Sequence, residues 1–143
     1  MRIAVDFDGT IVKHRYPEIG EEIPFATDTL KMLIADQHRL ILWSVREGEL
    51  LEEAVAWCRE RGVEFYAINR DYPEEHGTEQ GFSRKLKADL FIDDRSLGGL
   101  PDWGTIYSMI TSRRHLKPVP QDAIGPKSYK LSLKERLSGR AKR

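Results

Sequence analysis

The sequence predicts an α/β protein with three layers, in which a Rossmann-like parallel sheet has helices on both faces. Four short apolar runs have the length of buried strands. The segments after the first and second runs carry apolar residues at helical spacing, so strand and helix alternate as in parallel sheets. Each run also ends in small polar or acidic residues, as expected where the carboxyl ends of strands form a binding edge.

The first half of the chain is expected to contain two strands and two helices in alternation. Residues 2–5 form an apolar run that is too short for a helix and is followed by a turn-forming glycine. Residues 25–37 place apolar side chains three or four positions apart, which predicts an amphipathic helix. The apolar run 39–43 predicts the second strand, and 47–61 repeats the helical spacing. Gly62 follows at a position where glycine commonly ends a helix.

The second half adds two strands and one helix. Residues 63–68 predict the third strand, and the polar, glycine-containing segment 74–84 predicts a loop. Residues 88–92 predict the fourth strand, and 102–111 predict the last helix. Because parallel crossover connections are right-handed, the carboxyl ends of the strands share one edge of the sheet. That edge is expected to collect Asp6, Asp8, Ser44, Asn69, Asp93 and Asp94.

Length and charge limit the organisation of the chain and its partners. A chain of 143 residues fits one domain, which we expect over 1–114. The basic, proline-containing extension 115–143 could cover acidic surface, hold a neighbouring subunit in a homo-oligomer or be disordered, and its composition favours disorder. The 23 basic and 23 acidic residues balance, which argues against nucleic acid or an anionic membrane as the main partner.

Cysteine content and hydropathy predict a cytoplasmic protein. The single cysteine, Cys58, cannot form an internal disulfide, which fits a reducing compartment, and its place on the apolar side of a helix predicts a core residue. No apolar run of about 18 residues occurs, and the amino terminus enters the first strand without a charged and apolar leader. We therefore expect a soluble protein without a membrane partner.

Two carboxylates follow the first strand, at Asp6 and Asp8. Residues i and i+2 of a strand share a face, so these like charges would repel one another. A bound cation or a shared proton usually relieves such repulsion, although Asp and Gly are also common in plain turns. An EF-hand calcium loop does not fit, because Gly9 directly follows Asp8 and the twelfth position of the loop would be Pro17.

Residues 11–24 form a charged connection that is longer than the usual βα turn of about two to six residues. Long connections at this edge of a sheet are often lids, so we expect a flap over Asp6 and Asp8, with a plain surface loop as the alternative. His14 and Tyr16 in this flap are candidates for substrate contact.

The order of these motifs resembles the haloacid dehalogenase (HAD) superfamily of phosphohydrolases. The match consists of Asp6-Phe7-Asp8-Gly9-Thr10 after the first strand, Ser44 after the second, Lys85 before the fourth, and Asp93-Asp94 after it. It covers 1–114, and the short capless phosphatases of the superfamily are the most similar. The resemblance implies a HAD-like core with no separate cap domain, so the 11–24 flap, nearby loops or a neighbouring subunit would select substrates.

The resemblance gives each matched residue an implied role. Asp6 would attack phosphorus and become an aspartyl phosphate, and Asp8 would act as general acid and base. Thr10 would steady Asp8 and the turn, and Ser44 would donate a hydrogen bond to a phosphoryl oxygen. Lys85 would balance charge around the phosphate.

The resemblance also implies a magnesium ion. Asp93 and Asp94 match the metal-binding acids, and we expect Asp94 to touch the ion directly and Asp93 to act through water. The carboxylate of Asp6 and the main-chain carbonyl of Asp8 would complete the coordination sphere. Hard oxygen ligands of this kind are those that Mg²⁺ prefers.

Several residues have two interpretations at this point. Lys87 competes with Lys85 as the charge-balancing ammonium. Arg46 could clamp the phosphate through two hydrogen bonds or be a solvated arginine at the start of a helix. Asn69 could reach the substrate or be an ordinary turn residue, and Arg95 could be a surface charge.

These observations predict a Mg²⁺-dependent hydrolase of small or exposed phosphomonoesters that works through phospho-Asp6. A phosphotransferase of the same fold is an alternative, because its first half-reaction is identical. A non-catalytic phosphate-binding or receiver-like module is a third reading. A receiver domain carries its phosphorylated Asp at the end of the third strand, where this chain has Asn69.

Overall fold

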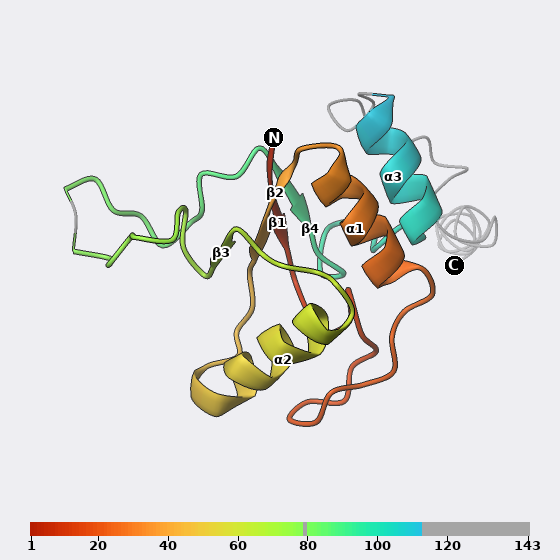
Figure 1. Cartoon of the computed structure of the whole chain (residues 1–143), viewed down its shortest axis with the longest axis horizontal. Helices are drawn as coiled ribbons and strands as arrows, with labels where there is room; N and C mark the ends of the chain where they lie inside the picture. The colour runs from red at the N-terminus through yellow and green to blue at the C-terminus, as the bar shows by residue number, and fades with distance from the viewer. Residues whose placement is uncertain (79, 113–143) are drawn as a thin grey trace, which may run out of the picture.

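A computed structural model describes residues 1–78 and 80–112 as an α/β fold built on a four-stranded parallel sheet (Figure 1). The sheet has the order β3-β2-β1-β4. Its strands are β1 (Arg2–Val5), β2 (Arg39–Leu42), β3 (Ala67–Ile68) and β4 (Leu90–Ile92). In register, Ala4 of β1 lies opposite Ile41 of β2 and Phe91 of β4. The predicted α/β class with a parallel sheet is therefore confirmed, and the described residues include no separate cap domain.

Three helices complete the described fold, and each lies within the range predicted for it. They are α1 (Ala26–Ala35), α2 (Gly48–Glu60) and α3 (Trp103–Thr111). Gly62 follows α2 with φ of +81°, a conformation that glycine adopts without strain. The carboxylate of Asp102 caps α3 by accepting a hydrogen bond from the amide of Thr105 at 2.9 Å.

The third strand is shorter than predicted. Residues 63–68 were expected to pair, but β3 contains only Ala67 and Ile68. The amide of Val63 donates instead to the carbonyl of Cys58 at 3.0 Å, which closes the end of α2. Cys58 is buried as predicted, and burial raises the pKa of its thiol to about 12.

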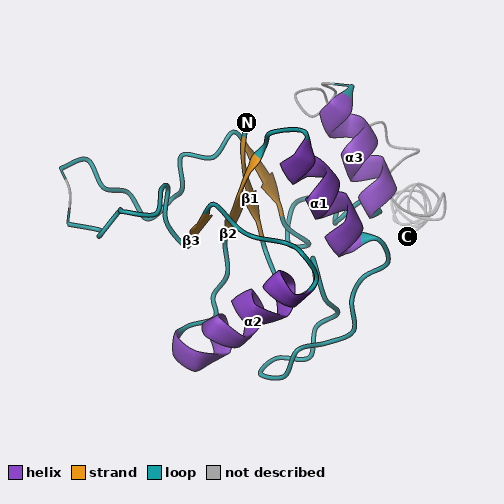
Figure 2. Ribbon diagram, viewed as in Figure 1, coloured by secondary structure: helices purple, strands orange, loops and turns teal. Residues whose placement is uncertain are grey.

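All three helices pack on one face of the sheet. From β1 to β2 to β3 the chain moves in a single direction across the sheet, so right-handed crossovers place α1 and α2 on the same side. Apolar side chains of α1, α2 and α3 join those of β1, β2 and β4 in one buried cluster. In Figure 2, α1 and α3 lie side by side, on the same side of the strands.

The opposite face carries a loop where the sequence led us to expect helices. The return from β3 to β4 crosses the sheet in the reverse direction, so it passes over the other face. There Leu86 packs against Ala4, Ile41 and Ala67. The described residues between β3 and β4 contain no helix, because this polar, glycine-containing segment lacks an apolar stripe (Figure 2).

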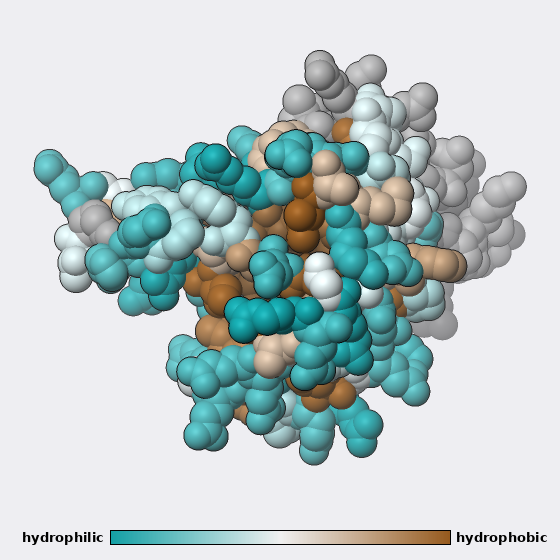
Figure 3. All heavy atoms as spheres, in the orientation of Figure 1, coloured by the Kyte–Doolittle hydropathy of each residue, from teal (hydrophilic) through white to brown (hydrophobic). Residues whose placement is uncertain are grey.

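Hydrophilic residues cover most of the face seen in Figure 3, and apolar atoms are visible mainly near its centre. Within 1–78 and 80–112, the structure has no helix with the length and apolar content needed to cross a membrane. The predicted basic extension, 115–143, lies outside the described residues.

Candidate active site

The carboxyl ends of β1 and β4 lie side by side at the point where the sheet order reverses. The chain leaves β1 for β2 on one side, and β4 adds to the other side of β1. Open α/β sheets bind ligands at such a switch point. The backbone N–H of Asp6 donates to the carbonyl of Ile92 at 3.0 Å, so the residues after β1 and after β4 are held together.

The turn after β1 requires glycine at position 9. Gly9 has φ of +88°, and a Cβ placed there would lie 2.5 Å from Oδ2 of Asp94 and 2.2 Å from Nε2 of His14. Any larger residue would push these side chains away from the turn. The Gly in the Asp-x-Asp-Gly-Thr motif is thus explained by close approach of the motif to the end of β4.

Thr10 is fully buried and links this turn to two other elements. Its hydroxyl donates to Oδ2 of Asp6 at 3.0 Å and accepts from the backbone N–H of Asp94 at 3.1 Å. Its carbonyl accepts from the indole N–H of Trp103 in α3 at 3.1 Å. The resemblance implied that Thr10 steadies Asp8, whereas its hydroxyl contacts Asp6 and Asp94.

Asp6, Asp93 and Asp94 form an acidic cluster at the carboxyl edge of the sheet. One carboxylate oxygen from each residue lies within 4.8 Å of the others. Three hard oxygen donors at this spacing fit a divalent cation such as Mg²⁺, which binds a few carboxylates and keeps several waters. The side chain of Asp8 is not one of the groups that make up this cluster.

Asp6 has a strongly perturbed acidity. Burial raises its pKa from 3.8 to about 6, and the negative charges of Asp93 and Asp94 add to the rise. Hydrogen bonds from the backbone of Phe7 and from Thr10 act in the opposite direction. A carboxyl group with a shifted pKa at the edge of a cavity is a candidate functional group.

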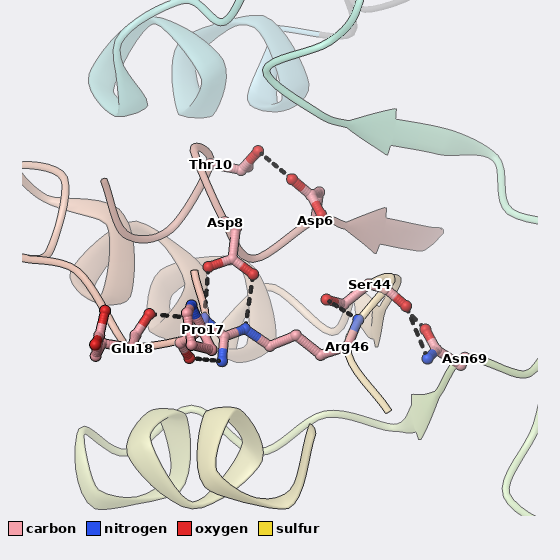
Figure 4. Close-up of polar contacts among 8 residues, drawn as sticks. All are labelled: Asp6, Asp8, Thr10, Pro17, Glu18, Ser44, Arg46 and Asn69. Atoms are coloured by element: carbon pink, nitrogen blue, oxygen red, sulfur yellow. Dashed lines mark hydrogen bonds and ion pairs between the residues drawn. The ribbon is translucent and has the colours of Figure 1, made fainter. Parts of the chain in front are cut away.

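Asp8 is held by Arg46, and its carboxylate points toward the guanidinium and away from the carboxylate of Asp6 (Figure 4). Nε and Nη2 of Arg46 donate to the two oxygens of Asp8, each at 2.7 Å. Nη1 and Nη2 also donate to the carbonyls of Pro17 and Glu18, each at 2.9 Å. The hydrogen bonds to Asp8 are the main reason that the pKa of Arg46 is raised.

This placement differs from both interpretations of Arg46. The side chain is 0% exposed, so it is not a solvated arginine. A two-point clamp on a phosphate would need the edge of the guanidinium that already binds Asp8. The expectation that Asp6 and Asp8 share a strand face is also wrong, because β1 ends at Val5 and both acids lie in the turn.

Asn69 holds the backbone of Ser44. Its Oδ1 accepts from the Ser44 amide at 2.8 Å, and its Nδ2 donates to the Ser44 carbonyl at 2.9 Å. The Ser44 hydroxyl accepts from the amide of Arg46 at 3.2 Å, which leaves its own proton for another acceptor. In this structure, Asn69 therefore supports Ser44 from the end of β3.

A cavity of about 210 Å³ opens beside the acidic cluster. Lys85 and Lys87 are exposed and are not among the residues that line it. The cation in its wall is Arg95, which directly follows the acidic pair in sequence. The lining residues are Asp6, Asp8, Trp43, Ser44, Val45, Asp93 and Arg95.

Two residues of the flap reach the site. Nε2 of His14 lies 2.9 Å from Oδ2 of Asp94, and the ring of Tyr16 lies 5.3 Å from the guanidinium of Arg46. The sequence suggested both as substrate contacts, whereas in the structure both contact other side chains of the protein.

Sequence reasoning did not find the role of Arg46. The available signal was the need of Asp8 for a positive partner within the protein.

No protein-family model matches the sequence, and no curated protein matches it. A solved structure, described as that of a conserved protein from Bacteroides thetaiotaomicron, is similar to the chain in sequence and in fold. The two chains are 70% identical, and the match covers 82% of this chain and 98% of that one with a TM-score of 0.76. This chain belongs to the family of that conserved Bacteroides protein.

Proposed function

We propose that this protein is a phosphomonoester hydrolase that uses a divalent cation and carries the phosphoryl group on Asp6. The main support is the acidic cluster of Asp6, Asp93 and Asp94, of which Asp6 and Asp93 line a cavity. Ser44 and Arg95 line the same cavity, and a hydroxyl and a guanidinium are both suited to phosphoryl oxygens. Carboxylates, a hydroxyl and a cation around one small cavity suit phosphoryl transfer, which depends on positioning and charge stabilisation.

In the proposed reaction, Asp6 is the nucleophile. One of its oxygens attacks phosphorus, the bond from phosphorus to the ester oxygen breaks, and the departing oxygen takes a proton from Asp8. Water then attacks the same phosphorus, gives a proton to Asp8 and releases phosphate from Asp6. Two displacements of this kind have lower barriers than direct attack by water.

The other lining groups would bind the phosphoryl oxygens. Ser44 has a hydroxyl proton to donate, and Asn69 fixes the backbone that carries it. Arg95 takes the place that the resemblance assigned to Lys85. A divalent cation on the acidic cluster would supply positive charge to offset that of the transferring phosphoryl group.

Release of p-nitrophenolate from p-nitrophenyl phosphate tests the proposal. We expect release that needs Mg²⁺ or a similar ion, with at least about a tenfold loss after chelation. Asp93→Asn should remove both this activity and the rise in melting temperature that the added ion causes. The control Asp28→Asn, at an exposed position on α1, should keep both. Ion-independent release, or none from a panel of aryl, sugar and nucleotide phosphates, would contradict the proposal.

Arg95→Ala is expected to lower kcat/KM for p-nitrophenyl phosphate about tenfold to 100-fold, because a charge-assisted hydrogen bond to the phosphate is lost. Lys85→Ala and Lys87→Ala should change it by less than about twofold, as exposed charges outside the cavity contribute little. Steady-state kinetics on the three variants decide which cation serves the phosphate. A large loss of kcat/KM in either lysine variant, together with unchanged kcat/KM in Arg95→Ala, would instead favour that lysine as the charge-balancing cation.

A further inference from the structure

Arg46 connects the loop that follows β2 with the turn after β1 and with the flap. It lies in the loop between β2 and α2, yet its side chain is 0% exposed. Its guanidinium makes two hydrogen bonds to Asp8 and one each to the carbonyls of Pro17 and Glu18 (Figure 4). The ring of Phe7 also lies 5.2 Å from the guanidinium.

The flap that offers these two carbonyls is closed by its own hydrogen bonds. The amide of Lys13 donates to the carbonyl of Glu21 at 2.8 Å, and the amide of Ile23 donates to the carbonyl of Ile11 at 2.9 Å. At its far end, the carboxylate of Glu22 accepts from the amide of Thr27 in α1 at 2.9 Å. The two arms of the flap are thus held together, and one end is bound to a helix.

We propose that Arg46 is a positioning residue that fixes the Asp8 carboxylate and the flap to one another, so that the flap stays permanently in place beside the site. The role of Asp8 in the reaction rests on the proposed function, whereas the fixed flap does not. Lifting the flap would leave N–H groups of a buried guanidinium without the Pro17 and Glu18 acceptors, which disfavours an open state.

The cavity supports the same reading. Every residue that lines it follows β1, β2 or β4. Val45, which is 79% exposed, and Arg95 are in its wall, so a substrate can reach Asp6 past them without passing under the flap. A flap that stays in place is consistent with this route.

Trypsin digestion of the folded parent protein tests the fixed flap. Lys13 and Arg15 lie in the flap, and Arg84 and Lys85 lie in the exposed loop before β4. We expect cleavage after Lys13 and Arg15 to be at least about 100-fold slower than cleavage after Arg84 and Lys85, since proteases cut backbone that opens locally. Similar rates at the two places, followed by mass spectrometry, would overturn the proposal.

Arg46→Met removes all four hydrogen bonds and keeps a long side chain. We expect it to accelerate cleavage after Arg15 at least about tenfold, while Arg59→Met, at an exposed position on α2, leaves the flap protected. Cleavage within α2 of the Arg46→Met protein reports loss of the whole fold. In that case Arg46→Lys, which keeps the charge without the planar donor set, replaces it. A folded Arg46 variant whose flap is as protected from trypsin as that of the parent would contradict the role of Arg46. Digestion of the parent protein tests whether the flap is fixed, whatever the variants show.

Two substrates with different leaving groups test the positioning of Asp8. p-Nitrophenolate departs without a proton, whereas the alkoxide of glycerol 2-phosphate needs one. Arg46→Lys should therefore lower kcat for glycerol 2-phosphate at least about tenfold more than for p-nitrophenyl phosphate, with little change in KM for either. Equal losses with a raised KM would assign Arg46 to phosphate binding. If the parent protein hydrolyses neither substrate, the proposed function fails, and the digestion still decides on the flap.

Discussion

Asp6→Asn protein is expected to release phosphate at least about 10³-fold more slowly than the parent, and yet, in buffer without added divalent ion, to be the more stable of the two at about pH 7.5. The loss of activity follows because an amide cannot form the phosphoryl intermediate that an aspartate carboxylate forms. The rate of p-nitrophenolate release measures it.

The gain in stability follows from the pKa of Asp6, which burial raises from 3.8 to about 6. Between these values the native protein binds a proton that the unfolded chain does not, so the free energy of unfolding falls as pH rises through this window. Above about pH 6 the full cost of the buried charge is present, and after allowance for partial exposure it is about 1–2 kcal/mol. Asp6→Asn removes this cost, so its melting temperature should rise at about pH 7.5 and change little at about pH 4.

Asp28→Asn is the matched control for both effects. Asp28 is an exposed residue of α1 that pairs with Lys31 at 2.9 Å, so the same chemical change should alter neither activity nor melting temperature. Full activity in the Asp6→Asn protein would exclude Asp6 as the nucleophile. A gain in melting temperature of equal size at about pH 4 and about pH 7.5 would show that ionisation of Asp6 is not its cause.

Asp8→Ala is expected to lower the free energy of unfolding by about 3–5 kcal/mol. The change leaves the guanidinium of Arg46 without its counter-charge in a place where the side chain is 0% exposed. Urea unfolding followed by tryptophan fluorescence measures the loss. The double variant Asp8→Leu/Arg46→Met should recover much of it, because removing both charged partners costs far less than removing one.

The exposed pair of Lys13 and Glu21 provides a contrast. Its N···O distance of 2.6 Å is no longer than the 2.7 Å between Arg46 and Asp8, but both of its side chains are largely exposed to solvent. Glu21→Ala should therefore leave the urea midpoint unchanged. A loss in Glu21→Ala as large as that in Asp8→Ala would mean that burial is not what makes the Arg46–Asp8 pair important.

The sequence was sufficient to place the acids of the cluster. Asp6, Asp93 and Asp94 each follow an apolar run of strand length, and the parallel arrangement requires those runs to end at one edge. The helices were also predictable, since their apolar stripes must face the sheet whatever the tertiary details. Both predictions depend on the local pattern of apolar residues, which is visible in a single sequence.

The partners of individual polar side chains were not predictable in the same way. Arginine is seldom fully buried, and the groups that hold Arg46 come from Asp8 and from a flap almost 30 positions earlier, as the separations of 28 and 29 residues show. Neither contact leaves a periodic signal. Arg95 was overlooked for a similar reason, because nothing in its local sequence distinguishes a cavity wall from the open surface.

The connection from β3 to β4 shows a further limit. Lys85 was assigned from its position before the fourth strand, but a segment without an apolar stripe has no face that fixes how its side chains are directed. In the structure Leu86 packs on the sheet, and Lys85 and Lys87 on either side of it are exposed. Because Leu86 faces the sheet, the lysines on either side of it are directed toward solvent.

Through Trp103, α3 supports the turn that carries Asp6. Its side chain is 1% exposed, and its indole N–H supports the carbonyl of Thr10. A chain cut before Trp103 would keep every side chain proposed to touch phosphate, but it would lose the hydrogen bond that supports the turn of the proposed nucleophile. Truncated forms made to isolate the smallest working unit must therefore retain α3.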